Sequence, residues 1–457
     1  MDDRLLHGIV FWRSWDLHIH TPASYVQNYG SDEAAWQRFL KELEALPKDF
    51  AAIGINDYLS IDGYRRVLHE KGNGRLSNIK TVFPVIELRL SKLAGTEKLQ
   101  RINYHVIFSD RLDPNVIQSQ FLNQLGGRAI LSPEMQIAGV EWHGYVSRES
   151  IQELGAKIRS TVPAEELCKF TETDFELGMN NINFDEGVVR GLLKSGGGLS
   201  GSYITAIGKA EWDQYRWNDH SIAEKKNIIN SVDAVFTAAR DVRAFHKAKE
   251  KLISEGVNSK LLDCSDAHHF MGSNDKDRIG NCSLWIKADP TFQGLKVALQ
   301  DYDDRVFVGR EPPVFVRMRT HPRRFISYVT FHRDPVSGSN ETWFEGQHLR
   351  LNPELVAIIG NRGNGKSALL DCIAFAAQSD YPIDRTSFLG KFRNSKDSKA
   401  ADFTVEIGWQ GGAPTRACLA DNWDPSAPPM VKHLPQHFID QLCNEGSDDF
   451  AKALEQA

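Results

Sequence analysis

Short apolar runs alternate with longer stretches of helical spacing over positions 1–311. The runs are rich in β-branched and aromatic residues, which favour strands. They fall at 50–58, 83–87, 102–108, 202–209, 234–237, 261–263, 283–287 and 305–309. Apolar residues recur every three to four positions at 31–46, 146–161, 221–230, 241–253 and 291–299, which predicts helices. The alternation predicts an α/β fold for this part of the chain.

The first strand of this pattern ends in Asp16-Leu17-His18-Ile19-His20-Thr21. Side chains alternate between the two faces of a strand, so His18 and His20 share one face. Two imidazoles one residue apart are able to hold one metal ion or a pair. Taken alone, a His-x-His pair fits an exposed strand equally well, so the case depends on what the later strands carry.

Three later strands carry side chains that ligate metals. Glu87 ends one apolar run, His105 lies inside the next, and Asp266 and His268 follow the run at 261–263. Imidazole suits zinc, iron, nickel and copper, and carboxylates extend the range to manganese. In a (β/α) barrel, residues at strand ends converge at one face of the barrel, so these side chains indicate a shared metal site.

His-x-His followed by Ser265-Asp266-Ala267-His268 resembles the PHP (polymerase and histidinol phosphatase) superfamily. The resemblance covers about the first two-thirds of the chain and implies a distorted seven-stranded (β/α) barrel. It implies two or three divalent metals, manganese, zinc or iron, which activate water for attack on a phosphoester. The ligands that it implies are His18, His20, Glu87, His105, Asp266 and His268.

The sequence departs from the family pattern at two strand ends. Tyr58 stands where PHP proteins usually have a histidine ligand, and Asp57 beside it either ligates or orients a neighbouring ligand. After the strand at 202–209, Lys209 and Glu211 stand where the family commonly has His-Pro. Lys209 is a candidate contact to a substrate phosphate and Glu211 a candidate ligand. Both residues fit ordinary loop charges equally well.

A second motif follows a predicted buried strand at Leu355–Ile359. Gly360-Asn361-Arg362-Gly363-Asn364-Gly365-Lys366-Ser367 fits G-x-x-x-x-G-K-[ST], and an apolar helix is predicted at Ala368–Phe375. Such a loop binds phosphate through backbone N–H groups and a helix N-terminus. We expect Lys366 to reach the terminal phosphates of ATP and Ser367 to hold Mg²⁺. The expected nucleotide-binding residues are Gly360, Asn361, Gly363, Asn364, Gly365, Lys366 and Ser367.

The amino-acid sequence of this loop resembles that of the ABC and SMC-type ATPases. Those proteins place an early β layer before the loop, here expected at 326–331 with 343–351, and a later Gln that contacts Mg²⁺ and water. Gln436, at the end of a predicted strand at 431–436, is the candidate, or else an unrelated surface residue. No Walker B run or signature motif follows within the 457 residues. We therefore expect an incomplete first lobe, from a longer protein, with little or no ATP turnover.

The predicted domains are a PHP domain at 1–311, a basic linker at 312–325 and the ATPase lobe at 326–457. Residues 112–200 are expected to form an insertion of uncertain fold over the barrel mouth. The linker arginines fit a solvated segment, or contacts to a phosphate backbone.

Composition restricts the compartment more than the function. The net charge of −6 and a pI near 6.2 give no global sign of nucleic-acid binding. Six cysteines without a Cys-x-x-Cys motif fit a reducing compartment. With no signal-peptide pattern at the N-terminus and no apolar stretch of membrane-spanning length, we expect a cytoplasmic protein.

PHP plus this type of ATPase resembles the TrlF-like fusions, a bacterial group associated with defence against phage and foreign nucleic acid. The resemblance implies a phosphoesterase, nuclease-like in action, on nucleic acid or a nucleotide, and a homo-oligomer formed through the ATPase. One alternative is a phosphatase for small phosphoesters that ATP regulates. Another is a catalytically inactive scaffold that binds nucleotide, which the Tyr58 and Lys209 replacements favour.

Overall fold

The computed structural model describes residues 12–94, 100–131, 139–142, 146–167, 171–208, 222–336, 346–380 and 387–434. The chain divides into two compact units, a larger one at Phe11–Pro312 and a smaller one that begins at Pro313. Among the described residues, no helix has the length and apolar character needed to cross a bilayer.

The larger unit is built on one nine-stranded sheet, ordered β11-β10-β1-β2-β3-β4-β7-β8-β9. Its strands are β1 (Trp12–Ile19), β2 (Phe50–Tyr58), β3 (Thr81–Ala94), β4 (Gln100–Phe108), β7 (Tyr203–Gly208), β8 (Ala234–Thr237), β9 (Leu261–Asp263), β10 (Leu284–Lys287) and β11 (Val306–Val308). Every strand predicted in this unit is confirmed.

The sheet curls so that the chain just after β9 meets the end of β1. β1, β2 and β3 run parallel, as do β7, β8 and β9, while β4 is antiparallel to both of its neighbours. A parallel bridge between Ile19 and Ala267 joins the chain beyond β9 to the end of β1. The result is a mixed α/β unit with a nearly closed, barrel-like sheet, and β10 and β11 extend it antiparallel from β1.

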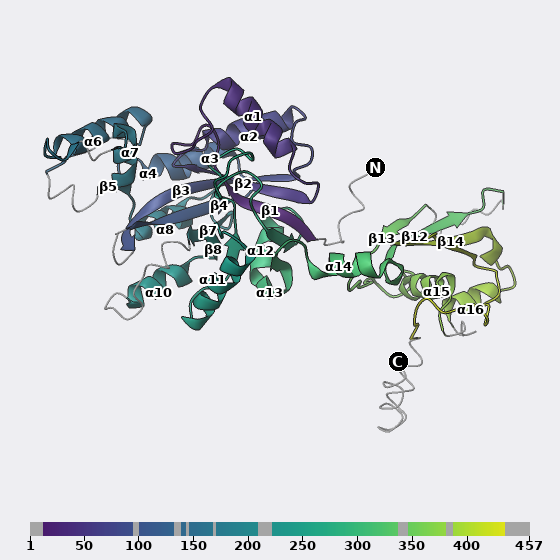
Figure 1. Cartoon of the computed structure of the whole chain (residues 1–457). Helices are drawn as coiled ribbons and strands as arrows, with labels where there is room; N and C mark the ends of the chain where they lie inside the picture. The colour runs from purple at the N-terminus through teal and green to yellow at the C-terminus, as the bar shows by residue number, and fades with distance from the viewer. Residues whose placement is uncertain are drawn as a thin grey trace. The chain divides into compact units, whose positions relative to one another are not determined.

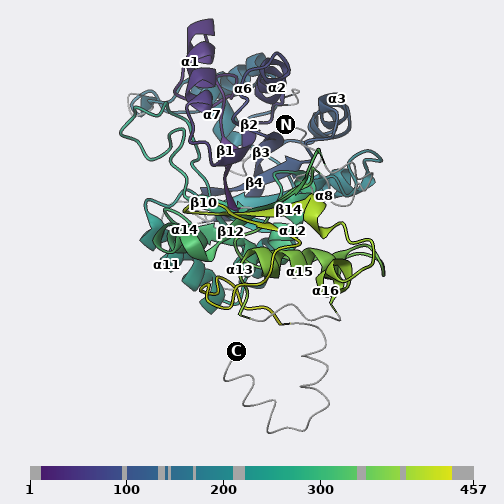
Figure 2. The same ribbon diagram turned by 90° about the vertical axis from the view of Figure 1, so that its right-hand side faces the viewer.

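Amphipathic helices cover the outside of this sheet. Figure 1 and Figure 2 show α1 (Glu33–Glu44) and α2 (Asp62–Gly72) on one side, and α11 (Val242–Ser254), α12 (Phe292–Gln300) and α13 (Tyr302–Arg305) on the other. In α1, Asp32 caps the helix by accepting from the Ala35 N–H at 2.7 Å, and Trp36, Phe39, Leu40 and Leu43 are buried. α10 (Ile222–Ser231) precedes β8.

The stretch between β4 and β7 is mainly helical. It holds α3 (Pro114–Ile117), a π-helical turn (Gln118–Leu122), α4 (Asn123–Leu125), β5 (Ile130–Leu131), α6 (Arg148–Ser160), α7 (Asp174–Asn181), β6 (Ile182–Asn183) and α8 (Glu186–Ser195). α6 and α7 lie side by side in Figure 1. Near the metal-ligand end of the sheet, the Phe175 ring at α7 lies 5.5 Å from that of Tyr25, in the loop after His20.

The smaller unit has a four-stranded antiparallel sheet, ordered β13-β12-β14-β15. The strands are β12 (Ile326–Arg333), β13 (His348–Arg350), β14 (Phe403–Trp409) and β15 (Thr415–Cys418). β12 and β13 confirm the predicted early β layer over its described residues. α15 (Lys366–Ala376) and α16 (Phe388–Arg393) pack on this sheet around Phe375, Leu389 and Phe403. The arginine-rich stretch that begins this unit forms α14 (Pro313–Thr320) and a 3₁₀ turn (Pro322–Arg324).

The predicted buried strand before the glycine loop is wrong in this structure. Leu355–Ile359 has no regular structure, and Leu355 and Ile359 are 86% and 88% exposed. A buried parallel strand needs hydrogen-bonded neighbours, and within the described residues no strand pairs with this run. At the later predicted strand, Val431 forms a single bridge with Ser379, and Lys432 to Leu434 are irregular.

Candidate metal centre and phosphate-binding loop

The seam that closes the larger sheet brings two distant segments together. The His20 N–H donates to Ala267 O at 3.0 Å, and the Ala267 N–H donates to His18 O at 3.2 Å. The buried Asp16 adds to this seam, since its Oδ1 accepts from the backbone N–H groups of His18 and Ser265. The His-x-His pair and the segment Ser265 to His268 therefore form one site because the sheet closes there.

The other side of the site is a row across three strands. Tyr58 of β2 is the Cα partner of Glu87 in β3, and Glu87 is the partner of His105 in β4. Paired residues on neighbouring strands point to the same face, so all three side chains face the site. The Tyr58 ring stacks on His20 with ring centroids 4.9 Å apart.

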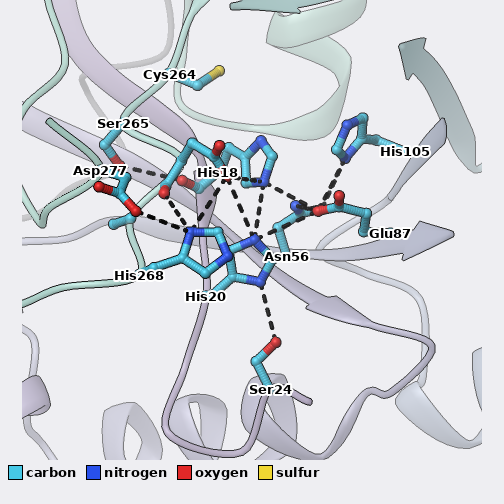
Figure 3. Close-up of polar contacts among 12 residues, drawn as sticks. His18, His20, Ser24, Asn56, Glu87, His105, Cys264, Ser265, His268 and Asp277 are labelled. Carbon is cyan, nitrogen blue, oxygen red and sulfur yellow. Dashed lines mark hydrogen bonds and ion pairs between the residues drawn. The ribbon is translucent and has the colours of Figure 1, made fainter. Parts of the chain in front are cut away.

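The ligand atoms gather around His18, as Figure 3 shows. His18 Nε2 lies 2.9 Å from Asp266 Oδ1, 3.1 Å from His20 Nε2 and 3.2 Å from Glu87 Oε2. His20 Nε2 lies 3.5 Å from Glu87 Oε2 and 3.6 Å from Asp266 Oδ1. Two groups have ligand atoms within 4.8 Å of one another and share His18, namely His18 with His20 and Asp266, and His18 with Glu87 and His105.

His268 lies at the edge of this cluster. Its ring centroid is 4.0 Å from that of His20. Its Nδ1 lies 2.8 Å from the carbonyl oxygen of Asp266, which can only accept, so Nδ1 carries the proton and Nε2 is left free to ligate. Asp277 Oδ2 is 3.8 Å from the same nitrogen.

Hydrogen bonds from outside the cluster orient its members. Asn56 donates to Glu87 Oε2 at 2.7 Å, and its Oδ1 lies 3.3 Å from His105 Nδ1. Ser24 Oγ lies 3.2 Å from His20 Nδ1. Such partners fix the ring orientation and tautomer of metal-ligating histidines. Asn56 and Ser24 are not among the residues predicted from the sequence. Alternation along β2 was the available signal, because Asn56 shares a face with Tyr58.

The electrostatics place most of these groups in the protonation state that a ligand needs. Burial lowers the pKa of His20 to about 3 and that of His105 to about 4. Burial raises the pKa of Glu87, but His105 and His18 outweigh it and lower that pKa to about 2. Burial lowers the pKa of His18, but Asp266 and Glu87 raise it to about 10, so a cation there competes with a proton for His18.

One buried oxygen indicates that the cluster fits a cation. Glu87 is fully buried, and its Oε1 has no hydrogen-bond partner among the described residues. A buried carboxylate oxygen without a partner is costly, and a divalent metal offers the compensation that the protein does not. Imidazoles and carboxylates crowded within hydrogen-bond distance are a donor set that suits zinc, iron or manganese.

Asp57 faces away from this cluster. Its carboxylate accepts from the Thr21 N–H at 2.9 Å and from the Thr21 hydroxyl at 2.8 Å. Burial raises the pKa of Asp57 to about 7. Its contacts thus hold the residue after His20 in place. The other candidates of this kind, Lys209 and Glu211, and Gln436 of the ATPase lobe, lie outside the described residues.

The glycine motif of the smaller unit forms a loop in front of α15. Gly363 and Gly365 have φ of +87° and +80°, which residues with a Cβ rarely adopt. Lys366 Nζ donates to Gly360 O and to Asn361 O, both at 2.8 Å, so its side chain folds over the loop. Asn364 lies within the loop, Ser367 stands in the first turn of α15, and the helix predicted after the loop is confirmed.

Comparison with known proteins finds one family model that matches the region of the loop. A family model described as an AAA domain matches residues 338–416, a range that holds the whole glycine motif. The match indicates an ATPase-type domain and implies the binding of nucleotide with Mg²⁺. No curated protein matches the chain.

Proposed function

We propose that the unit Phe11–Pro312 is a PHP-type metal-dependent phosphoesterase joined to an ATP-binding, ABC/SMC-like module. The observation that carries the proposal is the gathering of His18, His20, Glu87 and Asp266 around one point where the sheet closes. His105 and His268 complete the ligand set, which takes manganese, zinc or iron. The six ligand side chains are buried or half-buried, which does not fit the alternative of an exposed His-x-His pair on a surface strand.

The residues of this site divide into holding and positioning roles. Glu87 belongs to one ligand group, and its Oε2 also lies 3.5 Å from His20 of the other. Asn56 orients Glu87, and Ser24 orients His20. Asp57 fixes Thr21 and with it the turn that carries His20. Divalent metals bound there supply Lewis-acid chemistry that activates water for attack at a phosphorus centre. We keep Lys209 as a contact for the substrate phosphate and Glu211 as a further ligand in this proposal.

The ATPase module suggests what the phosphoesterase acts on. SMC-like ATPases generally serve DNA transactions, so we propose a nuclease-like activity on nucleic acid or nucleotides, gated by ATP and Mg²⁺ at Lys366, Ser367 and Gln436. The sequence resemblance to TrlF-like fusions supports a role in bacterial defence against phage and foreign nucleic acid, in the cytoplasm. The same resemblance supports a homo-oligomer formed through the ATPase.

A second candidate is a scaffold that binds metal and nucleotide without hydrolysing phosphoesters. The contact between Tyr58 and His20 favours it, because an aromatic ring occupies a place where the PHP pattern has a ligand. A small-molecule phosphatase is the third reading, and it requires the same metal site.

The test is metal content together with hydrolysis. We expect His18→Ala with His20→Ala to lose the bound transition metal and to lower cleavage of bis-p-nitrophenyl phosphate at least 100-fold. The matched control is His69→Ala with His246→Ala, which removes two exposed helical histidines. Unchanged metal in a folded double mutant would refute the site. Metal without hydrolysis in the wild type would favour the scaffold, and hydrolysis of monoesters alone would favour the phosphatase.

A further inference from the structure

The larger unit has a cavity away from the metal ligands. Its volume is about 380 Å³, in the range of small-molecule sites. It is bounded by the start of β7 at Tyr203 and Ile204, by Asp233 before β8 and by Lys260 before β9. The metal ligands on the parallel strands lie at the opposite ends, at His18 and beyond β9. The cavity thus lies at the amino ends of the strands.

Cationic side chains outnumber acidic ones in the lining of this cavity. Arg190 and Lys194 come from α8, Lys296 from α12, and Lys260 from the entry to β9. They belong to separate elements yet border one hollow of small-molecule size, so the fold places like charges together. Like charges gathered in this way repel one another, and an anion relieves that repulsion.

Most of these cations have no acidic partner among the described residues. Arg190 Nη1 lies 3.3 Å from Glu186 Oε1 on the same helix. Within the part of the chain that the structure describes, Lys194, Lys260 and Lys296 form no ion pair, and Lys296 instead lies over the Phe292 ring. Asp233 is the carboxylate of the lining, and its Oδ2 accepts from the Thr205 N–H and hydroxyl. The positive charge is therefore available to a ligand.

The remaining lining residues favour a compact ligand with an organic part. The lining includes the apolar side chains of Leu193, Ile204 and Leu299. It also includes two aromatic rings, those of Tyr104 and Tyr203. Neither group of metal-ligand residues found among the described residues includes a residue of this cavity, so the cavity is not a candidate for a second metal centre. A polynucleotide backbone needs cations along an open track, whereas these cations surround a hollow.

We propose that this cavity binds a phosphate-bearing small molecule of about nucleotide size, through Arg190, Lys260 and Lys296. The guanidinium and ammonium groups are the donors that hold phosphate by charge-assisted hydrogen bonds. The site is separate from the metal centre and from the glycine loop, so the proposal does not rest on the phosphoesterase activity.

The experiment is calorimetric titration of the full chain with pyrophosphate and with AMP. Lys366→Ala forms the background of every variant, so that the glycine loop does not take the probe. We expect Lys260→Gln with Lys296→Gln to weaken one saturable component at least tenfold. The control pair Lys48→Gln with Lys80→Gln removes the same charge from exposed sites and should leave the isotherm unchanged.

A conservative pair separates charge from folding. Lys260→Arg with Lys296→Arg should bind pyrophosphate within about threefold of the parent, because arginine also donates to phosphate. Equal isotherms for the Gln pair and the control pair would overturn the proposal. So would a loss that arginine does not restore, or an oligonucleotide that loses affinity on the Gln substitution while pyrophosphate and AMP do not.

Discussion

Glu87 lies close to all three histidines of the two ligand groups. Its Oε2 is within 3.7 Å of ring nitrogens from His18, His20 and His105, and its Oε1 has no hydrogen-bond partner among the described residues. Its placement follows from the pairing of β3 with β4, which sets Glu87 directly opposite His105. The strand-end pattern predicted both residues, but their pairing needed the strand order, which no local pattern contains.

We expect Glu87→Gln to lower metal affinity at least tenfold. Glutamine retains an oxygen that accepts from Asn56, so the substitution removes the negative charge with little change of shape. The measurement is metal retention during competition with a chelator. The control Glu250→Gln changes an exposed carboxylate on α11 and should retain metal as the wild type does. Equal retention in the two variants would remove Glu87 from the ligand set.

Lys366 is the residue of the glycine loop that we expect to contact the terminal phosphates of ATP. Its ammonium group donates to the carbonyls of Gly360 and Asn361, and phosphate oxygens would take over those hydrogen bonds. We expect Lys366→Ala to weaken binding of ATP with Mg²⁺ at least tenfold in calorimetry. Lys391→Ala, an exposed lysine on α16, is the control. Wild-type affinity in the Lys366 variant would mean that the loop does not bind nucleotide in the expected way.

Among the elements, α2 packs closely on Asp57 and Thr21 because Gly63 has no side chain. A Cβ placed on Gly63 would lie 2.0 Å from Asp57 Oδ2 and 2.1 Å from Thr21 Oγ1. Such distances force the helix or the Thr21 turn to move. The first turn of α2 therefore closes over the Asp57–Thr21 contact, and that contact holds the turn that carries His20.

We expect Gly63→Ala to destabilise the larger unit by about 1–3 kcal/mol, the usual cost of overpacking. Gly72→Ala on the same helix is the control, because its Cβ would meet nothing within 4 Å and alanine favours the helix. Urea denaturation measures both variants. A Gly63→Ala midpoint equal to or above that of Gly72→Ala would show that α2 is not confined here.

Apolar runs in the sequence predicted strands correctly where neighbouring strands pair with them in the structure. The apolar run at 50–58 became β2, buried along its whole length, because strands lie on both sides of it. Leu355–Ile359 is just as apolar but lacks strand partners in the described residues, so apolar character alone did not make a strand. β14 was not predicted from the sequence, although it pairs with both β12 and β15 in the sheet.

At the scale of the whole molecule, the two units have separate hydrophobic cores. One is centred on residues such as Phe83, whose ring stacks on Trp15, and the other on residues such as Phe403. Among the described residues the two clusters share no side chain, so we expect a defect in one core to act first on the unit that contains it.

We expect Phe403→Ala to cost about 3–5 kcal/mol of stability in the smaller unit, and Phe83→Ala a similar amount in the larger one. Hydrogen exchange measured by mass spectrometry should lose protection within 326–434 for the first variant and within 12–312 for the second. Metal content should fall only with Phe83→Ala. Loss of protection across both units from either substitution would contradict independent cores.

The reversed strand β4 has a consequence for how this molecule can change over time. Because β4 and β7 are antiparallel neighbours, Phe108 pairs with Tyr203, and the Ser109 N–H donates to Ser202 O at 2.8 Å. The entire stretch 109–202 therefore begins and ends at one point, as the tip of a single long hairpin. It is an insertion between two paired strands, and its two ends are hydrogen-bonded to each other. Residues can be gained or lost in the exposed loops of this stretch without altering the register that sets His105 opposite Glu87, so this is where we expect evolution, or an engineer, to vary the length of the protein first.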